Sequence, residues 1–225
     1  NPGDRENSLY ASVELSLQRL PKEVRERVQR LAVVQGGGNL VLLSQLMGLE
    51  VKVAAAVFTL LVKVGIAELQ EYCYVSLDPA LTAYLKLALS EEQLAQLTLM
   101  WAEAMTSLVA FLNQQLFENS KIALRLASLE MPNLVSLLRW LEQKLDKKDD
   151  VTAKQVAQTS GDIRRLLSPL NYPTVLMQAV ALQEKATAFI SKWGHAQFQY
   201  EVQQIETLLN QGQMEAAHLK AQSLL

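Results

Sequence analysis

Cysteine is almost absent from this chain. Cys73 is the only one among 225 residues, so an intrachain disulfide and a thiolate metal cluster are both excluded. A single thiol is typical of a reducing compartment, and we expect the protein to be cytoplasmic. Tyr72 and Tyr74 flank Cys73, and no basic residue lies close to it in sequence. We therefore predict a buried packing role for this thiol and not a nucleophilic one.

Patterns that carry catalysis or bind metals are missing as well. The two histidines, His195 and His218, lie in amphipathic stretches near the end, where surface or packing roles are expected. The glycines at 36–38 are followed by Asn-Leu-Val and not by the Lys-Ser/Thr of a phosphate-binding loop, which indicates a flexible turn between helices. We predict no catalytic, cofactor-binding or metal-binding residue, no cofactor, and no enzymatic activity.

Charge and long apolar runs are also modest. The formal net charge is −2, and the 21 basic and 23 acidic residues are interspersed. This pattern does not indicate a basic surface for nucleic acid. No run reaches the roughly 18 uninterrupted apolar residues of a membrane span, so no membrane association is expected. The first residue is not Met, and no polar cap ends the last helix, so we expect a piece of a longer protein with further repeats after residue 225.

Apolar residues recur at helical spacing along nearly the whole chain. The predicted helices are residues 8–20, 22–34, 40–47, 50–64, 80–89, 91–117, 120–130, 132–145, 152–167, 173–193, 196–209 and 214–225. Residues 66–77 are rich in aromatic and β-branched residues and predict a small β-hairpin. The run at 146–150 has no apolar residue and indicates a solvated connector. Trp101, Trp140 and Trp193 lie in helical stripes and are expected in the core.

Several helix starts carry recognisable caps. Asp78 before Pro79 has the chemistry of an N-cap, and Ser90 with Gln93 forms a capping box. We predict a mainly α fold, with a winged-helix-like domain containing a small β-hairpin at 1–89. An all-α domain at 90–225 would follow and end in a tetratricopeptide-like hairpin around Gly212.

The order of three helices and a hairpin is that of a winged helix, whose third helix enters the major groove in DNA-binding members. Here the third helix, 50–64, has only Lys52 and Lys63 as bases, and the hairpin carries Glu68 and Glu71 without any base. It also contains five apolar residues that we expect to pack inside: Val53, Val57, Leu60, Leu61 and Val64. Because phosphate neutralisation supplies most of the affinity for duplex DNA, nucleic-acid binding is not expected.

Four segments together carry a resemblance to a known family. They are Leu15-Ser16-Leu17 to Leu20-Pro21, Leu31-Ala32-Val33-Val34, the stretch from Leu60 to Glu68, and Leu77-Asp78-Pro79-Ala80-Leu81. They resemble the winged-helix region that follows the nucleotide-binding module of bacterial NB-ARC-type signalling ATPases, the STAND class. The match covers about 8–89; Trp101 to Met105 and Met131 to Leu134 are also similar to bacterial members. Many members carry His where this chain has Asp78, a carboxylate that would repel phosphate.

The resemblance implies a non-catalytic regulatory and protein–protein interaction segment of a larger signalling ATPase. Its partners would be the nucleotide-binding module of the parent protein and an unknown protein. The alternative is a winged-helix transcriptional regulator with a helical sensor or dimerisation domain. An enzyme ranks third, because it would need a catalytic site assembled from scattered carboxylates.

Overall fold

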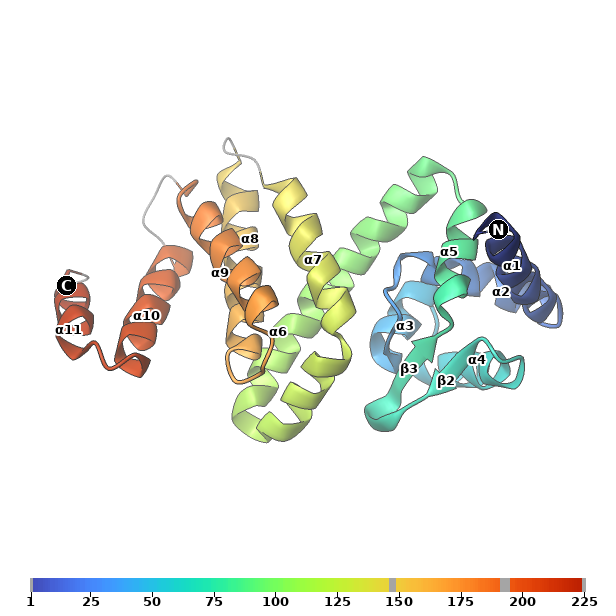
Figure 1. Ribbon diagram of the computed structural model, residues 1–225, viewed down its shortest axis with the longest axis horizontal. Coiled ribbons are helices and arrows are strands. Elements are labelled where there is room, and N and C mark those ends of the chain that lie inside the picture. Colours follow the sequence, from blue (N-terminus) through green and yellow to red (C-terminus); the bar gives the residue numbers. More distant parts are fainter. Residues whose placement is uncertain (1, 146–148, 191–194, 224–225) are drawn as a thin grey trace. The chain divides into compact units, whose positions relative to one another are not determined.

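The computed structural model describes residues 2–145, 149–190 and 195–223, and most of them are helical (Figure 1). The mainly α class expected from the sequence is therefore confirmed. The chain divides into two compact units, Asn1–Leu137 and Leu138–Leu225. The boundary that the sequence suggested between residues 89 and 90 falls inside the first unit.

The first unit holds the sheet and the longest helix. Its elements in chain order are α1 (Pro2–Gln18), α2 (Lys22–Val28), the 3₁₀ helix η1 (Gln29–Val33), β1 (Gly37–Asn39), α3 (Leu40–Met47), α4 (Val51–Lys63), β2 (Ala67–Leu69), the short turn η2 (Glu71–Cys73), β3 (Tyr74–Leu77), α5 (Pro79–Leu87), α6 (Glu91–Leu129) and the first half of α7 (Met131–Lys144).

The predicted caps are present. The Asp78 carboxylate accepts from the Ala80 N–H at 2.8 Å, and Ser90 and Gln93 form the reciprocal pair of a capping box. Each cap satisfies a backbone N–H that has no partner in the first turn of a helix. The Asn39 side chain likewise accepts from the Val41 N–H at 2.9 Å and starts α3.

Two predicted helices differ in their course. The helix expected at 22–34 tightens after Val28 into the 3₁₀ turn η1. The two helices expected at 91–117 and 120–130 form one element, α6, which is kinked at Asn119 (φ −148°, ψ 72°). The two helices were therefore placed correctly, and the part of α6 after Asn119 folds back on the part before it, so that Leu126 lines the same pocket as Leu108 and Phe111 (Figure 1).

The sheet has one strand more than the sequence predicted. β2 and β3 form the expected hairpin, and β1 pairs antiparallel with the other edge of β3, with Gly37 opposite Ser76. The interpretation of 36–38 as a flexible helix–helix turn is thus wrong. Gly37 has φ 144°, and a Cβ there would lie 2.2 Å from the Val75 carbonyl oxygen, so only glycine lets the two strands approach this closely.

The tip of the hairpin corrects a second expectation. Tyr72 and Cys73 both have φ 56°, the left-handed region that non-glycine residues rarely adopt. This turn directs Cys73 into solvent, so its predicted burial is wrong. The turn is supported by an ion pair between Glu71 and Arg125 of α6, 2.5 Å between the closest atoms.

The core of the first unit lies between η1, the helices α3 to α6 and the sheet. Its largest fully buried side chains are Leu31, Leu42, Leu43, Leu46, Met47, Phe58, Leu61, Leu81, Met105, Leu112, Leu134 and Leu137. Trp101 is 3% exposed, as expected for a core residue. The rings of Tyr10 and Tyr84 lie 6.1 Å apart and join α1 to α5.

The second unit consists of helices only, within the part of it that the structure describes. They are the second half of α7, α8 (Asp150–Leu167), α9 (Pro173–Thr187), α10 (His195–Asn210) and α11 (Met214–Gln222). α8 and α9 pack side by side, and α10 and α11 form the hairpin predicted around Gly212 (Figure 1). Trp140 is half-buried, with the Lys144 ammonium 5.6 Å from its ring centroid.

Some predictions fall on residues outside the described ranges. These are most of the connector at 146–150, of which Asp149 is described as the cap of α8, and Trp193. Among the described residues, α6 is long and apolar enough to cross a membrane, and α3 with α4 passes the same test only if the bent pair counts as one span. Core helices of soluble proteins pass this test too, so it is weak evidence of a span.

Candidate functional site

Helices α3 and α4 form a helix-turn-helix in the first unit. Their axes are bent by 98° across residues 48–50, and Gly48 ends α3 in the left-handed conformation (φ 64°). An angle near 90–120° across a short glycine-containing turn is characteristic of this motif. The second helix of such a motif, here α4, is the one that meets a partner in DNA-binding proteins.

The outer face of α4 combines two lysines with apolar residues. Ala54, Val57, Phe58 and Leu61 are buried, which leaves the opposite face to Lys52, Ala56, Thr59 and Lys63. Three valines flank this outer face: Val51, Val53 and Val62 are 43%, 47% and 37% exposed. Val53 was expected to pack inside with four other residues of this helix; that expectation is wrong, because Val53 lies on the flank of the outer face.

The hairpin beside α4 presents no basic side chain. Leu69 of β2 is 53% exposed, Glu68 is exposed, and Glu71 is engaged by Arg125. β2 packs next to the end of α4, so the two elements form one neighbourhood (Figure 1). Apolar surface, and not positive charge, is the main property of this neighbourhood.

A buried polar cluster, which we name the Glu130 junction, joins β1 to the corner between α6 and α7. It consists of Glu130, Asn133 and the backbone of residues 35–39. The Glu130 carboxylate accepts from the Asn39 N–H at 2.6 Å and from the Asn133 amide at 2.8 Å. Asn133 also donates to the Gly37 carbonyl at 2.7 Å and accepts from the Gln35 N–H at 2.9 Å. The junction thus ties the edge strand to the long helix.

Burial changes the acidity of this junction. Both Glu130 and Asn133 are fully buried. Desolvation raises the pKa of Glu130 from 4.5 to about 7, although the hydrogen bonds from Asn39 and Asn133 oppose the rise. Burial, and then the nearby Glu130 charge, raise the pKa of Tyr74. The carboxyl of Glu130 therefore changes charge near neutral pH.

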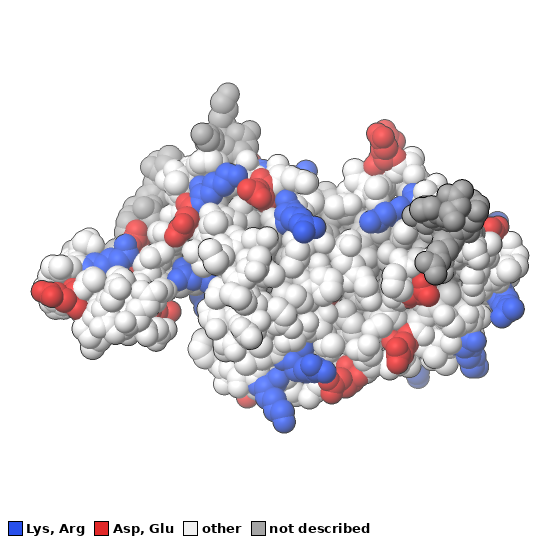
Figure 2. Space-filling view, in the orientation of Figure 1, with Lys and Arg blue, Asp and Glu red and all other residues white. Residues whose placement is uncertain are grey.

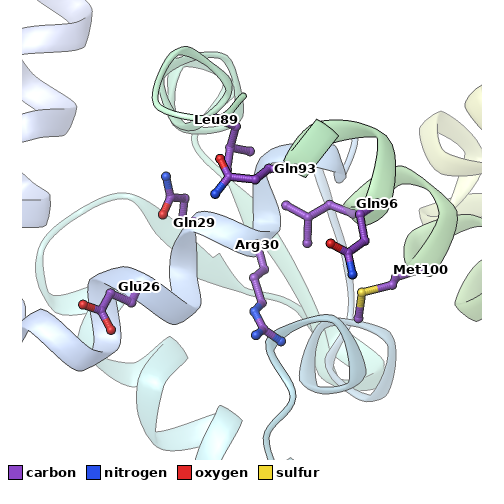
Figure 3. A pocket seen from close by; sticks show the side chains of 8 residues that line it. Glu26, Gln29, Arg30, Leu89, Gln93, Gln96 and Met100 are labelled. Atoms are coloured by element: carbon purple, nitrogen blue, oxygen red, sulfur yellow. The ribbon is translucent and has the colours of Figure 1, made fainter. Parts of the chain in front are cut away.

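A pocket of about 430 Å³ lies between the η1 region and the start of α6 (Figure 3). Its polar lining is Glu26, Gln29, Arg30, Gln93 and Gln96, and its apolar lining is Leu89, Leu97 and Met100. In Figure 3 the Arg30 side chain starts between the glutamines and its guanidinium points away from Gln29 and Gln93, and Glu26 points away from the group. A volume of this size is in the range of small-molecule sites.

The second unit contains a buried arginine held by neutral groups. Arg164 is 8% exposed and donates to the Thr207 hydroxyl at 2.7 Å and to the side-chain carbonyls of Gln183 and Gln203 at 3.3 and 3.4 Å. Gln183 also donates to Gln203 at 2.8 Å. Gly161 leaves room for this network, because a Cβ there would lie 2.7 Å from the Gln183 amide nitrogen. The network fixes α8, α9 and α10 against one another.

Charge is dispersed over the surface. Figure 2 shows lysines, arginines and acids scattered singly or in mixed groups on the face that it presents, without a continuous basic area. Among the described residues, no group of three or more His, Cys, Asp or Glu side chains could hold a metal ion. The face in Figure 2 shows no long basic stripe of the kind that duplex binders carry.

The residues singled out from sequence have the following places. Asp78 caps α5, and His218 is exposed on α11; the side chain of His195 lies outside the described residues. The sequence reasoning missed Glu130, Asn133 and Arg164. An acid and an amide on both sides of Met131-Pro132, within an apolar stretch, were the available signal for the junction.

The comparisons with known proteins give no assignment: no family model, curated protein or solved structure matches this chain.

Proposed function

We propose that this chain is a non-catalytic regulatory and protein–protein interaction segment of a larger STAND-type signalling ATPase. Residues 1–89 would form a winged helix that contacts the nucleotide-binding module of the parent protein, and the helices after it would present a surface to a partner. The element order supports this proposal. A helix, a short strand, a helix-turn-helix and a hairpin follow one another, and β3 lies between β1 and β2. This is the arrangement expected of a winged helix.

The observation that carries the protein-binding role is the exposed apolar surface on both sides of the outer face of α4. Val51 and Val62 are solvent-exposed on one side of this face and Val53 on the other, and Leu69 of β2 is exposed as well, although burying each of these side chains would be favourable. Exposed apolar residues bordered by polar ones are typical of protein interfaces. The nucleotide-binding module is the partner that the resemblance implies for this face.

The Glu130 junction supports a regulatory role. It links the edge strand of the small sheet to the α6–α7 corner by hydrogen bonds between residues more than 90 positions apart. If the helices adopt two arrangements, a partner that binds one of them more tightly would favour that arrangement. The hydrogen bonds of the junction would then transmit the change to the sheet. Asp78 serves as a helix cap, so no phosphate-sensing role is proposed for it.

The test is photo-cross-linking in the full-length gene product. A benzophenone amino acid replaces Val53, and a control replaces Lys22, whose side chain is 82% exposed on another helix. We expect Val53 to cross-link to the ATPase module and Lys22 to give background only. Equal background from both positions, or cross-links from Val53 to nucleic acid, would overturn the proposal.

The alternative remains a transcriptional regulator. Its support is the 98° helix-turn-helix together with Lys52, Thr59 and Lys63 on the outer face of α4. A mixed-sequence DNA duplex should then bind with an affinity that falls steeply with salt, and Lys52→Ala with Lys63→Ala should abolish binding. The proposed function predicts no such binding at any salt concentration.

A further inference from the structure

Two arginine side chains meet at the end of α3. Arg27 donates from Nη1 to the Met47 carbonyl at 3.2 Å. A Cβ built on Gly48 would lie 3.1 Å from Nη1 of Arg30 and 3.4 Å from Nη1 of Arg27. Both guanidinium groups therefore border the same small space, and their Nη1 atoms cannot be farther apart than the sum of these two distances.

This arrangement places two positive charges together without a matching negative charge. None of the six ion pairs found among the described residues involves Arg27 or Arg30. The carbonyl end of α3 offers only about half an elementary negative charge, which helps to hold Arg27 but does not balance both groups. Arg27 is exposed and Arg30 half-buried, so water screens part of their repulsion, and an anion beside them would relieve the rest.

The space in front of Arg30 is suited to a ligand. The pocket of about 430 Å³ described above is lined by Arg30 and by the neutral amides of Gln29, Gln93 and Gln96, with Leu89, Leu97 and Met100 as an apolar side. Glu26 is the one acid in the lining and points away from the guanidinium (Figure 3). An anionic head would pair with Arg30, and the amides would bond a polar body.

We propose that this pocket binds a small molecule with a carboxylate or phosphate group, which Arg30 holds with help from Arg27. Arg30 lies in η1, before the sheet in sequence, whereas Gln93 and Gln96 lie at the start of α6. The ligand therefore contacts both η1 and α6. Its binding strengthens the contact between η1 and α6. This inference does not depend on the proposed signalling role, because it concerns a different face from that of α4.

The experiment measures binding of inorganic phosphate and of malonate to the full chain by isothermal titration calorimetry, with sodium chloride at matched ionic strength as the blank. We expect saturable binding of at least one anion; the one that binds identifies the head group as phosphate or carboxylate. Arg30→Met should weaken it about tenfold or more, since a charge-assisted hydrogen bond is lost. Arg25→Met, which removes an exposed charge from the neighbouring helix, should leave it unchanged.

A second variant keeps the result interpretable if Arg30→Met does not fold. Gln96→Glu preserves the size of the side chain and adds a negative charge to the pocket wall, so it should also weaken anion binding about tenfold. Circular dichroism checks that each variant keeps its helices. The proposal is overturned if neither anion binds saturably, or if Arg25→Met weakens binding as much as Arg30→Met does.

Discussion

The carboxylate of Glu130 accepts a 2.6 Å hydrogen bond from the backbone N–H of Asn39, 91 positions earlier in the chain. This hydrogen bond joins the residue directly before α3 to the corner between α6 and α7. Both partners lie in the first compact unit, so the bond is part of its tertiary structure and not a link between units. It also places an ionisable group in the core, which makes the stability of the fold dependent on pH.

Glu130 should make the protein less stable as pH rises. Its folded-state pKa is raised from 4.5 to about 7, so the folded state binds the proton more tightly than the unfolded state. The resulting stabilisation is complete below the unfolded pKa and is lost as pH rises through the folded pKa. At about 1.4 kcal/mol per pKa unit, we expect a loss of about 3 kcal/mol of unfolding free energy across this window.

Urea unfolding of the unchanged protein and of Glu130→Gln, at about pH 5 and about pH 8, measures this loss. The Gln variant should lose about 3 kcal/mol less than the unchanged protein over the same interval. Glu103→Gln, which removes an exposed carboxylate from α6, should follow the unchanged protein. Parallel pH profiles for all three proteins would contradict the buried titration.

Gly37 should tolerate no side chain. In Gly37→Ala the new Cβ would lie 2.2 Å from the Val75 carbonyl oxygen at a φ of 144°, so β1 must move away from β3. We expect a loss of about 3 kcal/mol or more in unfolding free energy, because a clash and a strained backbone add. Gly36→Ala is the matched control: it also has positive φ (73°) but open space around it, and should lose about 1 kcal/mol.

Cys73 should be replaceable by glycine with a gain in stability. The left-handed conformation costs a non-glycine residue about 1–2 kcal/mol. Glycine avoids this cost but loses more backbone entropy on folding, which offsets part of the gain. We therefore expect Cys73→Gly to raise the unfolding free energy by up to about 1 kcal/mol, as measured by thermal or urea unfolding. Cys73→Ser keeps the backbone strain and should not differ from the unchanged protein; a gain of the same size in Ser would refute the strain explanation.

Arg164 should be essential to the second unit. Arg164→Met removes the hydrogen bonds to Gln183, Gln203 and Thr207 and leaves the buried side-chain carbonyl of Gln183 without this donor, at a cost of about 3 kcal/mol. Arg165→Met loses a pair with Asp162 that is 38% exposed on the arginine side, and should lose less than about 1 kcal/mol. Hydrogen exchange of α8 and α10 measures the two effects; similar protection in both variants would show that the network contributes little.

Local signals predicted much of the fold. The mainly α class, the caps at Asp78 and Ser90, and the hairpin were all readable, because each depends on neighbours within a few positions. The break near Asn119 was also visible in the pattern. Periodicity could not tell how the chain turns there, since the pocket that Leu126 shares with Leu108 and Phe111 forms only in the tertiary structure.

The sequence by itself determined most of the helices, the hairpin and the scarcity of catalytic groups, because composition and short-range periodicity carry that information. Only the tertiary structure decided that Gly37 belongs to a strand, that Cys73 faces solvent, and that Glu130 and Arg164 are buried. It also brought Arg27 and Arg30 together at Gly48. Each of these features depends on which distant segment packs against a residue, and desolvation, strand pairing and charge proximity act only once that packing exists.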